Sequence, residues 1–181
     1  VFSFAGKKMN LSVSIGIVVK TIFYQSPDDV LRDAEMALSC CKEQGGGQVK
    51  VFEKEMLERA IESLQLENDL RLGMQNQEFI LHYQPIIRLG DMRLTGLEAL
   101  IRWNHPEHGI IYPNQFISKA EEIGLINQLG NWVLSQGCTQ IKEWRRTLPG
   151  FDEITLNINI SGIQFLQPGL AERVAGIIHE H

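Results

Sequence analysis

Residues 97–103, near the middle of the chain, constrain its fold more than any other segment. Side chains of a β-strand alternate between two faces, and here the alternation separates two kinds of residue. One face is apolar and the other carries charge: Leu97, Ala99, Ile101 and Trp103 on the first, and Glu98, Leu100 and Arg102 on the second. A strand of this kind predicts a sheet that helices cover on the apolar side.

The charged face of this strand has two interpretations. A carboxylate and a guanidinium four residues apart, Glu98 and Arg102, can hold a metal ion and a phosphate oxygen side by side. That arrangement favours metal-assisted attack on a phosphodiester. Alternatively, both side chains are only solvated, because antiparallel strands often bury one face and expose the other to water. The sequence around the strand favours the first interpretation.

An ordered set of motifs surrounds the strand. Tyr83–Ile86 reads Tyr-Gln-Pro-Ile, Glu98–Trp103 reads Glu-Ala-Leu-Ile-Arg-Trp, and Asn159–Ser161 reads Asn-Ile-Ser. Between the last two lie Pro-Asn-Gln-Phe-Ile at 113–117 and Ala-Glu-Glu-Ile-Gly-Leu-Ile at 120–126. From about residue 66 to residue 181, this set resembles the first half of an EAL domain, the phosphodiesterase module that opens cyclic di-GMP to linear pGpG.

The resemblance implies an α/β fold, a partial EAL-type (β/α)8 barrel in which the first strand runs antiparallel, whereas ordinary barrels have only parallel strands. The sequence agrees, because the short Gly90-Asp91 turn joins a strand at 79–89 to the strand at 94–103. Another strand is expected at 154–160. Helices are expected from Asn114, as the N-cap, to about Ile123, and from Ile126 towards the break at Pro149-Gly150.

The resemblance also implies a metal site. Inward-facing side chains at the carboxyl ends of barrel strands build the site, and Glu98 and Asn159 both point away from their apolar strand neighbours. By resemblance these two residues are metal ligands, and oxygen donors of this kind suit Mg²⁺ or Mn²⁺ better than zinc. Asn157 shares the face of Asn159 and is the alternative on that strand.

Four further residues match family positions that contact the substrate. Arg102 matches the residue that holds a substrate phosphate, where a planar guanidinium can grip two oxygens. Gln84, Leu100 and Gln164 match positions that line the nucleotide, although Gln84 is equally suited to a backbone hydrogen bond near Pro85. No histidine is expected to act as a general base. The expected positions are the barrel interior for His82 and the surface for His105, His108, His179 and His181.

The first 52 residues predict a second, smaller piece. Residues 1–4 and 10–19 are expected to form a β-hairpin around a polar turn at 6–8, and a short strand is expected at 49–52. Between them, Ser26 caps a helix that has Pro27 at its first position, and the glycines at 45–47 end it.

This piece resembles the C-terminal part of a GGDEF domain, the diguanylate cyclase module often found ahead of EAL. The matching segments are Val13–Gly16 and Ala34–Leu38, followed by Lys42. Lys42 matches a family lysine that approaches the nucleotide phosphates; the alternative is a solvated helix lysine. Departures from the family pattern indicate a degenerate module, and they are Glu35, Ser39, Cys41 and Gly47.

A charged helix is expected to join the two regions. It carries one apolar stripe, made by Leu57, Ala60, Ile61 and Leu64, and a separate helix is expected to follow from Leu66. The expected domains are therefore 1–52 for the GGDEF-like part, 53–65 for the helical linker and 66–181 for the first half of the EAL domain. The chain begins inside an expected strand and ends inside an expected helix, so we expect it to be a fragment of a larger protein.

Charge and cysteine content narrow the expected partners. The net charge of −5 argues against a surface for duplex nucleic acid, which needs clustered Lys and Arg. Cys40, Cys41 and Cys138 form no Cys-x-x-Cys pair and are expected as reduced thiols in the cytoplasm.

No apolar run approaches the roughly 20 residues that span a bilayer, so a membrane anchor or sensor would lie upstream. The resemblance implies cyclic di-GMP as ligand and a homodimer.

The family pattern includes further metal ligands that residues 1–181 lack. These are additional carboxylates, some in an Asp-Asp-Phe-Gly segment, together with a lysine and a later glutamate. Glu98 and Asn159 alone cannot run a two-metal mechanism, so we expect these 181 residues by themselves to be inactive, whereas the parent protein hydrolyses or binds cyclic di-GMP. The alternatives are a receptor that binds cyclic di-GMP without hydrolysing it and a signalling scaffold.

Overall fold

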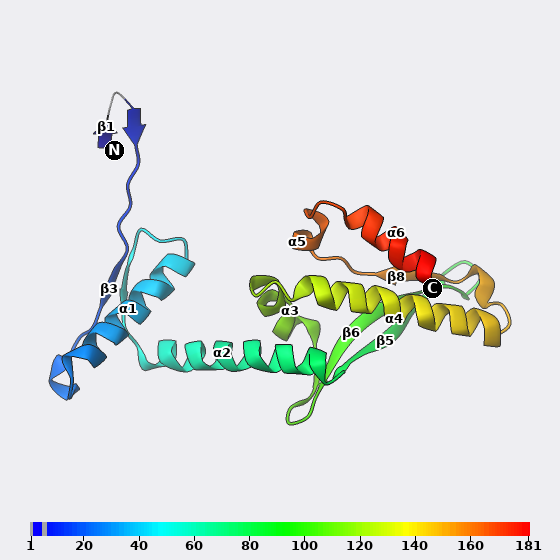
Figure 1. The fold of residues 1–181 in the computed structure, drawn as a ribbon, viewed down its shortest axis with the longest axis horizontal. Helices are drawn as coiled ribbons and strands as arrows, with labels where there is room; N and C mark the ends of the chain where they lie inside the picture. The colour runs from blue at the N-terminus through cyan, green and yellow to red at the C-terminus, as the bar shows by residue number, and fades with distance from the viewer. Residues whose placement is uncertain (1, 5–6) are drawn as a thin grey trace. The chain divides into compact units, whose positions relative to one another are not determined.

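The computed structural model describes residues 2–4 and 7–181. They fall into two compact units, Val1–Leu64 and Gln65–His181 (Figure 1). None of the helices in these residues combines the length and the apolar character that crossing a bilayer requires.

The first unit contains two small pairs of strands and one long helix. β1 (Phe2–Phe4) pairs antiparallel with β2 (Lys7–Met9), and β3 (Ile15–Ile17) pairs parallel with β4 (Val49–Val51). A short 3-10 helix, η1 (Thr21–Phe23), and α1 (Pro27–Glu43) connect β3 to β4. The expected hairpin between 1–4 and 10–19 is therefore wrong for the described residues, and its expected turn at 6–8 includes residue 6, which lies outside them.

The packing of α1 explains why β3 pairs with a distant strand. A Cβ on Gly16 would lie 2.1 Å from the carbonyl oxygen of Ala34, so only glycine lets the backbone of α1 lie this close to β3. With α1 on β3, the chain that leaves α1 returns beside β3 and forms β4, as in other crossover connections.

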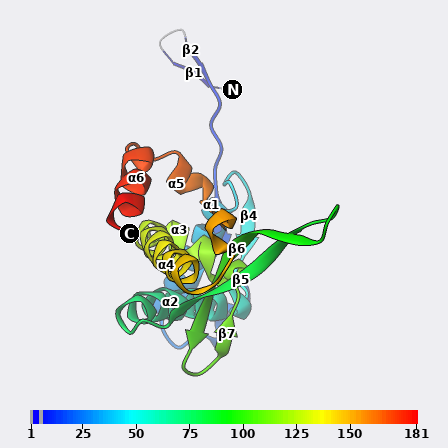
Figure 2. The same cartoon turned by 90° about the vertical axis from the view of Figure 1, so that its right-hand side faces the viewer.

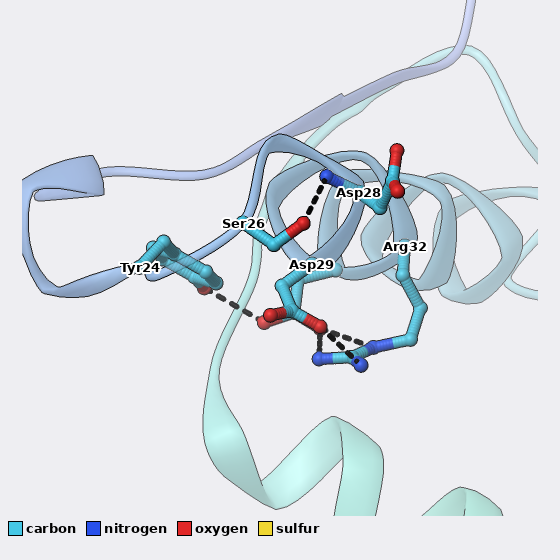
Figure 3. A network of polar contacts seen from close by, with 6 residues as sticks. Tyr24, Ser26, Asp28, Asp29 and Arg32 are labelled. Atoms are coloured by element: carbon cyan, nitrogen blue, oxygen red, sulfur yellow. Dashed lines mark hydrogen bonds and ion pairs between the residues drawn. The ribbon is translucent and has the colours of Figure 1, made fainter.

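The start of α1 follows the sequence prediction. Ser26 is the N-cap, its hydroxyl accepts a hydrogen bond from the backbone N–H of Asp28 at 3.2 Å, and Pro27 takes the first helical position. One turn later, Arg32 forms an ion pair with Asp29 at 2.7 Å (Figure 3). Burial and the hydrogen bond from Tyr24 fix Asp33 on the inner side of the helix.

One helix, α2 (Lys54–Gln75), crosses the border between the two units. The expected break near residue 66 is wrong, because the chain has no proline or glycine between Lys54 and Leu72 that would end a helix. Of the stretch expected as a separate linker, 53–65, residues 54–65 form the first part of this helix.

The second unit is built around a four-stranded sheet with β6 (Arg93–His105) at its centre. β5 (Phe79–Arg88) pairs antiparallel with one edge of β6, and the hairpin between them closes at 89–92 (Figure 2). On the other edge, β8 (Thr155–Ile158) pairs parallel with residues 96–99, and β7 (Gly109–Ile111) pairs antiparallel with residues 103–105. The antiparallel direction of β5 and the parallel direction of β8 are those that the resemblance implies, whereas β7 was not expected.

Helices cover one face of this sheet. α3 (Pro113–Glu122) and α4 (Ile126–Thr147) pack on the strands. After them come η2 (Phe151–Glu153), α5 (Gly162–Phe165) and α6 (Leu170–Glu180), and α6 packs against α4 (Figure 1). The N-cap of α3 is Tyr112, not the expected Asn114, because Pro113 fits the first helical position with its fixed φ. The unit is thus a mixed α/β structure.

The core lies between the helices and the apolar face of β5, β6 and β8. One cluster packs Trp103 and Phe79 against helices α2, α3 and α4, and a second packs Leu97 against Ile141 and Ile154. The alternation predicted for 97–103 therefore holds, since Leu97, Ala99 and Trp103 are buried. The opposite face of the sheet carries the candidate site.

Candidate functional site

Three neighbouring strands place polar side chains side by side on the uncovered face. Glu98 lies directly opposite Gln84 on β5 and directly opposite Asn157 on β8. Residues that pair across a sheet point to the same face, so these three side chains form one row across it. One step along β6, Leu100 lies opposite His82, which is exposed and not enclosed as expected.

The two residues expected as metal ligands are in contact. Asn159 is the first residue after β8, and its side-chain amide donates a hydrogen bond to a carboxylate oxygen of Glu98 at 2.7 Å. Two strands that run parallel thus bring together a carboxylate from the middle of β6 and an amide that directly follows the carboxyl end of β8. Asn157, the alternative on the same strand, lies beside Glu98 in the ladder.

Arg102 is held some distance along β6 from Glu98. Four residues of strand separate their Cα atoms by about 13 Å. One guanidinium nitrogen of Arg102 donates to the carbonyl oxygen of Ile101 at 2.8 Å, and its carbon lies 4.8 Å from the centre of the Tyr112 ring. Within the described residues, Nε of Arg102 is buried and has no hydrogen-bond partner. Tyr112 orients the guanidinium by a cation–π contact that the sequence did not indicate.

A cavity of about 190 Å³ lies between β6, α3, α4 and the loop after β8, and Asn159, but not Glu98, belongs to its lining. Its lining is mainly apolar and includes Leu100, Asn159 and Gln164. The β6 residues in the lining lie at and beside the part of the strand edge that is unpaired, between the segment paired with β8 and the segment paired with β7. The geometry thus gathers Leu100, Asn159 and Gln164 around one hollow, whereas Gln84 lies in the row on the sheet.

Gln164 is buried at the start of α5. The side-chain oxygen of Gln164 accepts a hydrogen bond from the backbone N–H of Ser161 at 3.2 Å. The backbone N–H of Gln164 donates a hydrogen bond to the Ser161 hydroxyl at 3.3 Å. This reciprocal arrangement is a capping box. The side-chain oxygen of Gln164, a residue expected to line the nucleotide, is therefore hydrogen-bonded within the protein.

Lys42, the residue expected near phosphates in the first unit, lies exposed in the last turn of α1. Its side chain is in a position that suits either a contact with an anion or simple solvation, the two interpretations that the sequence left open.

The donor atoms at the candidate site suit a hard divalent cation in kind but not in number. Glu98 supplies a carboxylate and Asn159 an amide, which match the oxygen ligands of Mg²⁺ or Mn²⁺. Such ions take about six ligands. Among residues 2–4 and 7–181, no three side chains of His, Cys, Asp or Glu come together as a metal site. The pair can therefore be part of a larger ligand set.

A buried polar cluster supports the end of β6. Trp103 is fully buried, and its indole N–H donates to the Glu78 carboxylate at 2.9 Å. His105, expected at the surface, is buried, and its Nδ1 accepts backbone hydrogen bonds from Glu107 and His108 in the turn before β7. The tight turn folds these amides back onto the ring, which the sequence pattern did not indicate. His181 likewise contacts α4, through Ser135 and Thr139.

Glu78 makes the contribution of this cluster to folding stability dependent on pH. The hydrogen bond from Trp103, helped by the one from Asn76, holds the pKa of Glu78 below its usual range, against the opposing effect of burial. A carboxyl whose folded pKa is depressed stabilises the fold above its unfolded pKa, about 4.3, and loses this contribution as pH falls through the folded pKa.

We therefore expect the stability difference between the wild type and Glu78→Gln to be constant above about pH 5 and to shrink below about pH 4, because protonation makes the two side chains alike. Urea unfolding midpoints of both proteins, measured from pH 3 to pH 7, test this. Parallel profiles across the whole range would show that the indole N–H does not favour the charged carboxylate.

Comparisons with known proteins identify the family of the chain. The model of the EAL domain family matches residues 67–181. The bifunctional diguanylate cyclase/cyclic di-GMP phosphodiesterase MucR of Pseudomonas aeruginosa is 36% identical over 174 residues, which are 96% of this chain and 25% of MucR. The cyclic di-GMP phosphodiesterase PdeR of Escherichia coli is 42% identical over 135 residues, 74% of this chain and 20% of PdeR.

A solved structure, described as the PaMucR phosphodiesterase in complex with c-di-GMP, superposes with a TM-score of 0.61 and 39% identity. The match covers 65% of this chain and 47% of that one. The chain belongs to the EAL domain family. It spans a quarter or less of the length of these curated relatives.

Proposed function

We propose that the protein to which this chain belongs is a cyclic di-GMP phosphodiesterase, which hydrolyses cyclic di-GMP to pGpG with Mg²⁺ or Mn²⁺. The contact between Glu98 and Asn159 is the observation that carries the proposal, because it joins two oxygen-bearing side chains from neighbouring strands that run parallel. The names of MucR and PdeR support the same activity.

Five of the site residues have a proposed role here. Glu98 and Asn159 would hold a divalent cation, and Asn159 would turn its amide so that the oxygen replaces the N–H that now faces Glu98. When bound, the cation would polarise a phosphoryl oxygen and lower the pKa of a bound water. Arg102, held over the Tyr112 ring, would orient a phosphate, and Leu100 would contact the base. Gln84, beside Glu98 in the row, would hydrogen-bond to the ligand.

Residues 1–181 by themselves are proposed to be inactive and to need further ligands from the rest of a closed barrel. The support is the single carboxylate in the contacting pair, which supplies too few donors for two cations.

The first unit is proposed to be a degenerate GGDEF part, 1–52, joined through 53–65 to the EAL part, 66–181. The alignment with a bifunctional relative, MucR, supports this because it covers 96% of the chain. A homodimer in the cytoplasm, with a sensor upstream, completes the proposal on the basis of the resemblance.

The decisive experiment is turnover by the intact protein. With cyclic di-GMP and Mn²⁺, we expect pGpG to accumulate, and addition of EDTA to stop the reaction, because the proposed ligands hold a hard cation. Chromatography of the nucleotides measures both outcomes. Binding of cyclic di-GMP without pGpG would favour the receptor alternative, and absence of binding in calorimetry would favour a scaffold.

A further inference from the structure

Asn159 depends on the chain that follows it for its position. The parallel ladder between β6 and β8 ends at the pair Ala99–Ile158, one residue before Asn159. The next ordered element is α5, whose N-cap is Ser161. Only Ile160 separates Asn159 from this cap, so the placement of α5 determines how the Asn159 amide meets Glu98.

The burial of α5 is the reverse of what its sequence predicts. Of its four described residues, Gly162–Phe165, only the polar Gln164 is buried, with 7% of its surface exposed. The apolar Phe165 and Leu166 are 74% and 82% exposed. Burying a polar side chain is costly unless it is hydrogen-bonded, and the capping box provides the hydrogen bonds. Gln164 is therefore the anchor of α5.

The anchor fits into a space that a glycine provides. A Cβ on Gly130 would lie 2.0 Å from Nε2 of Gln164 and 3.0 Å from its Cδ. Gly130 lies inside α4, where glycine is less favourable than alanine for the helix itself. Room for the Gln164 amide is the physical reason that this structure gives for a glycine here.

We propose that Gln164 is a positioning residue, which locks the Ser161 cap against Gly130 of α4 and thereby holds Asn159 beside Glu98. This inference rests on the proposed metal site. It assigns Gln164 to the support of a metal ligand in place of the nucleotide contact that the resemblance implies. Residues that orient metal ligands commonly change metal affinity by 10- to 100-fold when they are lost.

The first test is Gly130→Ala in the intact protein. The added methyl displaces the Gln164 amide, so we expect the Mn²⁺ dissociation constant, measured by calorimetry, to rise about 10-fold. The KM for cyclic di-GMP at saturating Mn²⁺ is expected to stay unchanged, because the substrate contacts are intact. Gly176→Ala in α6 is the matched control, since no described atom would lie within 4 Å of its Cβ.

Two further variants separate this mechanism from general loss of structure. In a Gln164→Ala background, Gly130→Ala is expected to have no additional effect, because the amide that it displaces is gone. Ser161→Thr keeps a capping hydroxyl and is expected to retain Mn²⁺ affinity, whereas Ser161→Ala is expected to lose it. Unchanged affinity in Gly130→Ala, or additive effects in the double variant, would overturn the inference.

Hydrogen exchange distinguishes failure of this inference from failure of the proposed function. If the wild type binds no Mn²⁺, the proposed function is wrong. Exchange of the amides at 159–164 still decides the positioning role. Faster exchange there in Gly130→Ala than in Gly176→Ala supports the lock, and equal exchange in the two variants rejects it.

Discussion

Replacing Glu98 by glutamine is expected to reduce both Mn²⁺ affinity and phosphodiesterase turnover of the intact protein by more than about 100-fold. Loss of an outer partner of a metal ligand typically costs 10- to 100-fold, and Glu98 is proposed as a direct ligand. The substitution removes one negative charge with almost no change in shape. Because the glutamine oxygen can still accept the hydrogen bond from Asn159, the local structure should persist.

The matched control for this prediction is Glu122→Gln on α3. Its side chain is exposed and pairs with Lys119 at 2.7 Å, on a helix surface outside the candidate site. Isothermal titration with Mn²⁺ and the initial rate of pGpG formation should both remain at wild-type values in the control. A Glu98→Gln protein that hydrolyses cyclic di-GMP at the wild-type rate would refute the metal-ligand assignment.

The main geometry of the site could be read from the sequence because it depends on short-range periodicity. Side chains two residues apart on a strand share a face, so Glu98, Leu100 and Arg102 had to point opposite to Leu97 and Trp103. The parallel pairing of β6 with β8 then places Asn159 near Glu98. The Tyr112 ring under Arg102 comes from a different segment, and no local pattern specifies that contact.

Other features could not be predicted because they depend on contacts between distant segments. β3 pairs with β4 across more than thirty residues only because α1 packs on Gly16. Gln164 is more buried than its apolar neighbours, so a prediction from hydrophobicity would bury the wrong face of α5. His105 is buried because its ring accepts two backbone N–H groups from a turn. In each case a specific hydrogen bond or close approach overrides the local preference.

Trp103 is the residue whose truncation should cost the most stability. It is fully buried, stacks on Phe79 with ring centres 5.5 Å apart, and contacts the Phe116 ring edge-on. Trp103→Ala removes these contacts and leaves a cavity, which typically costs about 3–5 kcal/mol. Hydrogen exchange of the β5 and β6 amides in the intact protein measures the change in local opening free energy. Phe165→Ala, at an exposed position, should change it by less than about 0.5 kcal/mol.

Trp103→Phe separates the packing of the ring from its hydrogen bond. Phenylalanine retains much of the stacking with Phe79 but cannot donate to Glu78, which then keeps a charge with one partner fewer. We expect a loss of about 1–2 kcal/mol, smaller than for alanine, because Glu78 is only half-buried and water can replace part of the bond. The loss should diminish as pH falls below about 4.3 and through the lower folded pKa of Glu78, because the carboxyl then becomes protonated. Equal losses in the phenylalanine and alanine variants would mean that the hydrogen bond, not ring packing, supports β6 beside Arg102.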